Sequence, residues 1–200
     1  MGKVQGGMTS LYRDAGLTDE QIGKVRLLNR ILISYNDFDQ AYEIASLLLE
    51  GSLYENYPRK NRQLVIALNM ATIIAYARPF LDSKGLLAHN RVPKGFHKTL
   101  NREEADLHSI VMEDRHTMMA HSDADENASI PLVFELEGHR SLIPQNASAF
   151  ANPLLPEAMR LLRQMSKKLR EHCFEYRKKM EPELIGFLPL TNVEQTNEAD

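Results

Sequence analysis

The sequence predicts an all-α fold: an up-and-down helical bundle with a short β-hairpin after its fourth helix. Apolar residues recur every three or four positions through most of the chain, which is the period of a helix with one buried face. Capping residues and prolines separate these periodic segments. A composition of 43% hydrophobic and 26% charged residues is that of a globular protein, so the chain has enough apolar material for a core.

The first helix is predicted to follow a short N-terminal arm. Residues 1–17 contain four glycines and little periodicity, so we expect this arm to be flexible. Thr18 and Gln21 form the pattern of a capping box, in which each side chain would satisfy a free backbone N–H. The helical period that follows extends to about Tyr35.

Two more helices are predicted in the first half of the chain. The pair Asn36-Asp37 can end the first helix and cap a second one, which we expect over about 38–54. Pro58 then breaks the chain, and a third helix is expected over about 59–77. The residues of this third helix are apolar nearly all round, which is typical of the central helix of a bundle.

A long connection separates the third helix from the fourth. Residues 82–101 have two glycines and no lasting period, and long connections are often functional. Asn101 is a suitable cap for a fourth helix, which should run to about Ala120. Two short strands within 130–143 are predicted to pair around Gly138.

The last predicted helix is long and regular. It starts at Pro153 or Pro156 and repeats apolar residues every three or four positions to about Met180. The residues that follow, 183–200, are mostly polar and are predicted to form a flexible tail. The chain is therefore expected to form a single helical domain over residues 18–182.

Composition and charge restrict the function. The formal net charge is −3, so the chain lacks the overall basic excess of most nucleic-acid-binding proteins, and any RNA contact needs a local patch. Cys173 is the only cysteine, which fits a reducing compartment. The N-terminus lacks the apolar run of a signal peptide, and the most apolar stretch, 64–77, is short for a bilayer. We therefore expect a cytoplasmic protein with no membrane partner.

The fourth helix is the candidate functional segment. At the period of an α-helix its residues fall on two adjacent stripes, one with Leu107, Val111, Asp114, Met118 and His121 and the other with His108, Met112, Arg115 and Met119. Both stripes mix apolar with ionisable residues. Buried charge is costly unless it is paired or used, so Asp114, Arg115 and His121 are candidates for a functional site.

Part of this segment resembles the motif of the HEPN superfamily, which consists of an Arg, a short spacer that often begins with a polar residue, and a His. In this sequence Arg115 is followed by five intervening residues, the first of them His116, and then by His121. Ser122 and Asp123 come next, and an Ala-His-Ser-Asp ending of this kind is similar to that of uncharacterised HEPN-like proteins.

A second segment carries the same resemblance. Tyr-Ala-Arg-Pro-Phe, at residues 76–80 and including Arg78, is similar to a segment of uncharacterised HEPN-like proteins. The order of the helices predicted over residues 20–180 is similar to that of HEPN proteins. The resemblance implies a small helical bundle from a superfamily that includes ribonucleases of toxin–antitoxin, phage-defence and CRISPR systems.

The resemblance implies metal-independent cleavage of RNA at a dimer cleft. Two subunits would bring their motifs together, with His121 acting on a proton of the ribose 2′-hydroxyl or of the leaving oxygen and Arg115 steadying the transferring phosphate. It implies a homodimer, an RNA substrate, an antitoxin protein as a further partner, and no metal or cofactor. The residues expected to support catalysis or to bind at the site are His116, Asp114, Ser122, Asp123 and Arg78.

Other interpretations of the same residues remain open. A catalytically silent HEPN-like homodimer would bind a small ligand, a nucleotide or a partner protein instead of cutting RNA. Alternatively, Arg115 would belong to an internal network with Asp114 or Asp123, and His121 would cap the C-terminal end of its helix. Arg78 would then be an ordinary surface arginine at a helix end.

Two further binding chemistries are compatible with the sequence. His and carboxylate side chains can hold zinc, and four such residues lie near one another in the chain: His108, His116, His121 and Asp123. The last helix carries eight Lys or Arg against four Glu over residues 157–181. A basic face of this kind can hold a phosphate backbone, although it is more often simply solvated.

The two stripes of the fourth helix predict a homodimer that uses this helix, because they offer more apolar and ionisable surface than one bundle interior should need. Sedimentation analysis at micromolar concentration checks this. We expect twice the mass of the 22.8 kDa chain, and a species of monomer mass alone would contradict the prediction.

Overall fold

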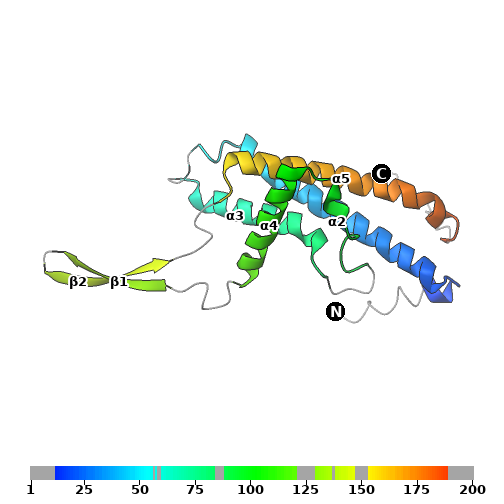
Figure 1. Cartoon of the computed structure of the whole chain (residues 1–200), viewed down its shortest axis with the longest axis horizontal. Coiled ribbons are helices and arrows are strands. Elements are labelled where there is room, and N and C mark those ends of the chain that lie inside the picture. The colour runs from blue at the N-terminus through cyan, green and yellow to red at the C-terminus, as the bar shows by residue number, and fades with distance from the viewer. Residues whose placement is uncertain are drawn as a thin grey trace, which may run out of the picture.

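The prediction of an all-α helical bundle is confirmed by a computed structural model of the chain (Figure 1). The structure describes residues 12–55, 57, 60–83, 88–120, 129–136, 138–146 and 153–188. Within these residues the elements are, in order, the helices α2 (Asp19–Glu50) and α3 (Arg62–Ala77), the 3₁₀ turns η1 (Arg78–Phe80) and η2 (Phe96–Thr99), helix α4 (Arg102–Ala120), the strands β1 (Ser129–Leu136) and β2 (His139–Asn146), and helix α5 (Pro156–Ile185).

The first two predicted helices form the single helix α2, so the predicted break at Asn36-Asp37 is wrong. Both residues have cap-forming side chains, but neither is a glycine or a proline, and nothing forces the backbone out of the helical conformation. The carboxylate of Asp37 instead accepts a hydrogen bond from Arg78 at 3.1 Å. Ser34 and Phe38, on either side of the pair, are fully buried, and this favours one uninterrupted helix.

The start of α2 matches its prediction. The Gln21 backbone N–H donates to Thr18 Oγ1 at 3.3 Å, and the Thr18 backbone N–H donates to Gln21 Oε1 at 2.8 Å, so the predicted capping box is present. Just before it, Leu17 is only 9% exposed and packs with Tyr12. The end of the arm predicted to be flexible is therefore packed on the bundle, while residues 1–11 lie outside the described residues.

The last helix extends beyond its predicted end near Met180. It continues to Ile185, past the expected domain limit at residue 182, and Leu184 is buried in the apolar cluster at the start of α2. This contact explains the extension, because a buried apolar side chain holds the final turn in place. Residues 189–200 of the predicted tail lie outside the described residues.

Helix α2 occupies the centre of the bundle, between α3 and α5, which both run antiparallel to it (Figure 1). At its middle the Phe38 ring packs edge-on against Tyr76 of α3, with ring centroids 6.0 Å apart. The same ring stacks on Phe96 of the long connection, with centroids 6.5 Å apart and ring planes 6° apart. The largest fully buried side chains from α5 are Met159, Leu162, Met165 and Leu169.

Helix α3 is buried along one face rather than all round. Val65, Ile73 and Tyr76 are at most 1% exposed, whereas Leu64 is 49% exposed. The central place expected for this helix belongs to α2, because α2 has helices on both sides. By length and composition alone, Arg62–Phe80 could cross a membrane; 44% of this stretch is buried inside the fold, and core helices of soluble proteins often meet the same condition.

The predicted hairpin is confirmed as the antiparallel pair β1 and β2, which Figure 1 draws projecting from the helical body. The last pair in the register is Leu136 with His139, so the strands are joined by a two-residue turn. Gly138 in this turn has φ = 82°, a left-handed conformation that glycine adopts without strain. Local turn chemistry therefore accounts for the hairpin.

A buried arginine holds the long connection against α2. Arg30 is 4% exposed, and its Nε donates to the backbone carbonyl of His89 at 2.7 Å. Its Nη2 donates to the carbonyl of Asn90 at 2.8 Å and to the hydroxyl of Ser83. Burial lowers the pKa of Arg30, yet an arginine in a protein stays charged, so these acceptors stabilise a cation inside the fold.

We predict that Arg30→Met destabilises the fold by at least about 1–3 kcal/mol, because the carbonyls it binds would lose a charged donor. Urea unfolding measures the change. Arg160→Met is the matched control: this side chain is 56% exposed and pairs only with Glu157 among the described residues, so a change within about 0.5 kcal/mol is expected. Equal effects of the two substitutions would show that Arg30 does not anchor the connection.

Candidate functional site

Helix α4 is fixed to the bundle at its N-terminal half. The Glu104 backbone N–H donates to Asn101 Oδ1 at 2.9 Å, and the Asn101 backbone N–H donates to Glu104 Oε2 at 2.7 Å, which confirms the predicted cap. Leu107 and Val111 are 7% and 0% exposed and face the core. From there α4 crosses the other helices steeply and leads away from them (Figure 1).

The two predicted stripes of α4 have different environments. Leu107 and Val111, from the first stripe, belong to the core. His108 and Met112, from the second stripe, line a pocket at the surface of the bundle. Arg115 continues this second stripe by one turn, and it is half-buried. The apolar-and-ionisable character of the second stripe therefore reflects a helix face at the edge of a pocket.

The predicted motif is only partly within the described residues. Arg115 is half-buried and His116 is exposed. Asp114 is half-buried, and its pKa is raised by burial and by the neighbouring charge of Glu113. The other three predicted residues, His121, Ser122 and Asp123, lie outside the described residues. The joint action of Arg115 and His121 stays a prediction.

Arg78 forms hydrogen bonds within the fold. Its Nη1 donates to Asp37 at 3.1 Å and to Gln40 at 3.0 Å, so it ties η1 to the middle of α2. Asp37 is only 12% exposed; burial raises its pKa, and the charges of Arg78 and Arg30 oppose this rise. Arg78 does not line the pocket beside α4. The contacts fit the interpretation of a helix-end arginine better than that of a ligand-binding residue.

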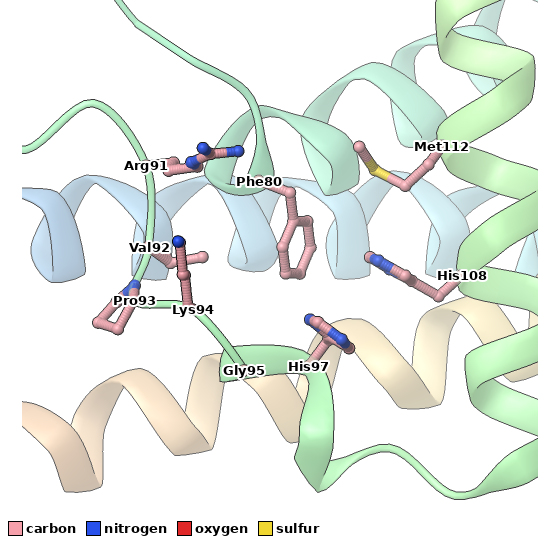
Figure 2. A pocket seen from close by; sticks show the side chains of 9 residues that line it. All are labelled: Phe80, Arg91, Val92, Pro93, Lys94, Gly95, His97, His108 and Met112. Carbon is pink, nitrogen blue, oxygen red and sulfur yellow. The ribbon is translucent and has the colours of Figure 1, made fainter.

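The pocket is built from three segments that are far apart in the sequence. η1, residues 91–97 of the long connection and α4 enclose a volume of about 330 Å³. Its lining consists of Phe80, Arg91, Val92, Pro93, Lys94, Gly95, His97, His108 and Met112. Figure 2 shows Arg91 and Lys94 together on one side, His97 and His108 on the other, and the Phe80 ring between them.

Three contacts hold the His108 ring in place at the pocket. Its Nδ1 lies 3.0 Å from the hydroxyl of Tyr76, its ring meets Phe80 edge-on at 4.7 Å between centroids, and it stacks on His97 at 5.5 Å and 8°. Burial, and secondarily the charge of His97, lower the pKa of His108 to about 4, so its imidazole is neutral near pH 7.

The tautomer of His108 follows from its partner. Burial raises the pKa of Tyr76, which is 0% exposed, so this phenol keeps its proton. When Tyr76 donates that proton to Nδ1, the neutral ring of His108 must carry its own proton on Nε2. The pocket then contains one oriented N–H donor that carries no formal charge.

The opposite side of the pocket is cationic. Arg91 and Lys94 are both exposed, and none of the nine lining residues is a carboxylate. The nearest acidic partner of Arg91 is Asp82, 3.6 Å away, and the two side chains are 55% and 71% exposed. An ion pair this exposed is weak, so the pocket keeps a surplus of positive charge.

Sequence reasoning missed most of this site. Arg91, Lys94 and His97 fall in the connection that has no lasting period, and nothing in their spacing predicts a shared wall with α4. A weak signal is present: Arg91, Lys94, His97 and Lys98 lie close together around Gly95, a glycine with φ = 83° that turns the chain there. For His108, the sequence indicates only a potential metal ligand.

The other two binding chemistries concern a zinc site and the basic face of α5. Two of the four candidate zinc ligands, His121 and Asp123, lie outside the described residues, and among the residues that are described no group of three or more His, Cys, Asp or Glu could hold a metal ion. Six of the eight basic residues of α5 form ion pairs with carboxylates: Arg160, Arg163, Lys168, Arg170, Arg177 and Lys178. Three of these pairs, made by Arg163, Lys168 and Arg170, join α5 to carboxylates of α2 and α4, while the other three lie on the exposed surface of α5, where ion pairs are weak. Part of the basic excess of this helix therefore serves its packing in the bundle.

Fold and pocket together define a helical-bundle protein with a basic, histidine-lined pocket at one edge. Comparison with known proteins finds no matching family model, no similar curated protein and no similar solved structure.

We predict that His108 remains unprotonated well below its ordinary pKa of 6.5, down to about 4. The unfolded chain takes up this proton at higher pH than the folded protein does, so stability is lost as pH falls from 6.5 towards 4. His108→Gln keeps an acceptor for Tyr76 but does not titrate. Urea unfolding across this range should show wild type losing more stability than the variant, and parallel losses would contradict a depressed pKa.

Proposed function

We propose that the protein is a HEPN-like, metal-independent ribonuclease in which Arg115 and His121 act at the cleft of a homodimer. The observation that carries the proposal is the position of Arg115. It lies on the same stripe of α4 as His108 and Met112, which line the basic pocket, and it is half-buried. A phosphate that approaches this edge of the bundle meets positive charge from two segments.

The chemistry needs few groups. His121 takes the proton of the ribose 2′-hydroxyl, whose oxygen attacks the adjacent phosphorus. The bond from phosphorus to the 5′-oxygen breaks, and that oxygen receives a proton from a second imidazole, the His121 of the other subunit. Arg115 stabilises the added negative charge on the phosphate through two N–H donors. The products are a 2′,3′-cyclic phosphate and a 5′-hydroxyl.

A dimer through α4 would complete this site. The exposed side of α4 includes Ile110, which is 53% exposed, so an apolar contact is available on this helix. Pairing two copies of this helix would place two Arg115 residues near one cleft. In the toxin–antitoxin setting that the resemblance implies, an antitoxin protein would act by covering or modifying this cleft.

A second function is favoured by a specific observation. The pocket of about 330 Å³ is complete without Arg115. Its His108 is neutral near pH 7 and hydrogen-bonded to Tyr76 rather than free to exchange protons. A catalytically silent HEPN-like homodimer that binds a small ligand would need only these features. Activity measurements distinguish the two functions.

We predict that His121→Ala lowers RNA cleavage by about 10²-fold or more without unfolding the protein, because it removes the proton-transfer group. Arg115→Lys should also lose most activity, since an ammonium cannot make the two-pronged contact. Cleavage of a labelled RNA by the purified protein is measured, with His139→Ala and Arg160→Lys as controls on exposed residues. A chelator should have no effect, and a 2′-deoxyribose at the cleaved position should block the reaction.

Melting temperatures make this experiment decisive. If wild type cuts no RNA and His121→Ala costs about 1–3 kcal/mol of stability, the motif is structural and the proposal fails. If wild type cuts RNA and the controls lose as much activity as His121→Ala, the activity does not reside in the motif.

A further inference from the structure

The pocket beside α4 has two chemically different sides, and neither of them contains the residues to which the ribonuclease proposal assigns the chemistry. Arg91 and Lys94 supply positive charge on one side, His97 and His108 present their rings on the other, and the Phe80 ring lies between them (Figure 2). Arg115 is not among the lining residues. A ligand that used both sides would need an anion at one end and a flat ring at the other.

The cationic side suits a phosphate. Among the described residues, the ion pair of Arg91 is a long one, 3.6 Å from its Nε to the exposed Asp82, so its two terminal nitrogens can still present a planar fork to an anion. Lys94, three residues further on, adds a point charge from the same segment. A phosphate monoester carries about −1.5 to −2 charge at pH 7 and several acceptor oxygens, which matches a fork and an ammonium better than a single carboxylate would.

The aromatic side suits a planar heterocycle. Phe80 and His108 meet edge-on at 4.7 Å, and His97 lies parallel to His108 at 5.5 Å, so flat ring surfaces border the cavity. Bases bind aromatic side chains by stacking, which tolerates different bases. The Nε2 proton of neutral His108 adds one donor for a ring nitrogen or a carbonyl.

We propose that this pocket binds a single nucleotide, with its phosphate between Arg91 and Lys94 and its base beside Phe80 and His108. The volume of about 330 Å³ is at the small end of the range of about 300–1,000 Å³ that holds small molecules, so one nucleotide fits and a longer strand does not. The nucleotide is either free or the terminal unit of an RNA strand. The binding holds whether or not the chain cleaves RNA.

Calorimetric titration of the full chain at low salt tests the proposal with three probes: AMP, adenosine and inorganic phosphate. AMP should bind at least about tenfold more tightly than either fragment, because only AMP engages both sides of the pocket. Adenosine bound as tightly as AMP would overturn the assignment of the phosphate to Arg91 and Lys94. Phosphate bound as tightly as AMP would overturn the aromatic half of the site.

A charge-matched pair of variants locates the binding. Arg91→Gln with Lys94→Gln should weaken AMP at least about tenfold while leaving the melting temperature unchanged, because both side chains are exposed. Arg102→Gln with Lys179→Gln removes the same charge from exposed positions outside the pocket and should leave AMP affinity unchanged. Equal losses of AMP affinity in both double variants would mean non-specific attraction and would overturn the proposal. The absence of AMP binding at millimolar concentration would overturn it as well.

Two additional titrations identify the source of the nucleotide and test whether the motif contributes to its binding. A short RNA that displaces AMP identifies a strand end as the ligand, whereas one that does not displace it identifies a free nucleotide. His121→Ala, which tests cleavage, should bind AMP as wild type does. Loss of AMP binding in His121→Ala would overturn the inference that this pocket is separate from the motif.

Discussion

The buried guanidinium of Arg30 is the interaction on which the candidate site depends. A charge that is 4% exposed needs hydrogen-bond acceptors, since an unpaired cation in the interior would be prohibitively costly. The Nε and Nη2 of Arg30 donate to the carbonyls of His89 and Asn90 and to the hydroxyl of Ser83. Two of these acceptors, His89 and Asn90, come directly before Arg91, the first of the two cations of the pocket. The need to satisfy a charge in the core therefore sets where the pocket's positive side lies.

Aromatic packing determines the opposite side. Phe96 is 3% exposed and stacks on Phe38 at the centre of α2, so the residue after it, His97, is placed at the surface beside α4. The same Phe38 ring packs against Phe80 with centroids 5.7 Å apart. One side chain of the central helix thus supports two walls of the pocket. Because His108 stacks on His97 and meets Phe80 edge-on, α4 closes a pocket that the core has already shaped.

The pocket-facing stripe of α4 carries two kinds of ionisable group. His108 is neutral near pH 7 because burial and the nearby His97 lower its pKa to about 4, so it can donate a hydrogen bond but does not attract anions. Arg115, two turns further along the same stripe, is half-buried and carries a permanent charge. A phosphate-bearing ligand can use both kinds of group. A ribonuclease and a protein that only binds nucleotides would both use these groups.

Local sequence determined the helices, the capping box at Thr18, the cap at Asn101 and the hairpin turn at Gly138, because caps, turns and helical period depend on neighbouring residues only. Only the tertiary structure decided that α2 continues through Asn36-Asp37. A cap-forming pair permits a helix break without requiring one, and the buried residues on either side of the pair favour an unbroken helix. It also decided the pocket. Its residues come from segments without a shared period, brought together by contacts from distant parts of the chain.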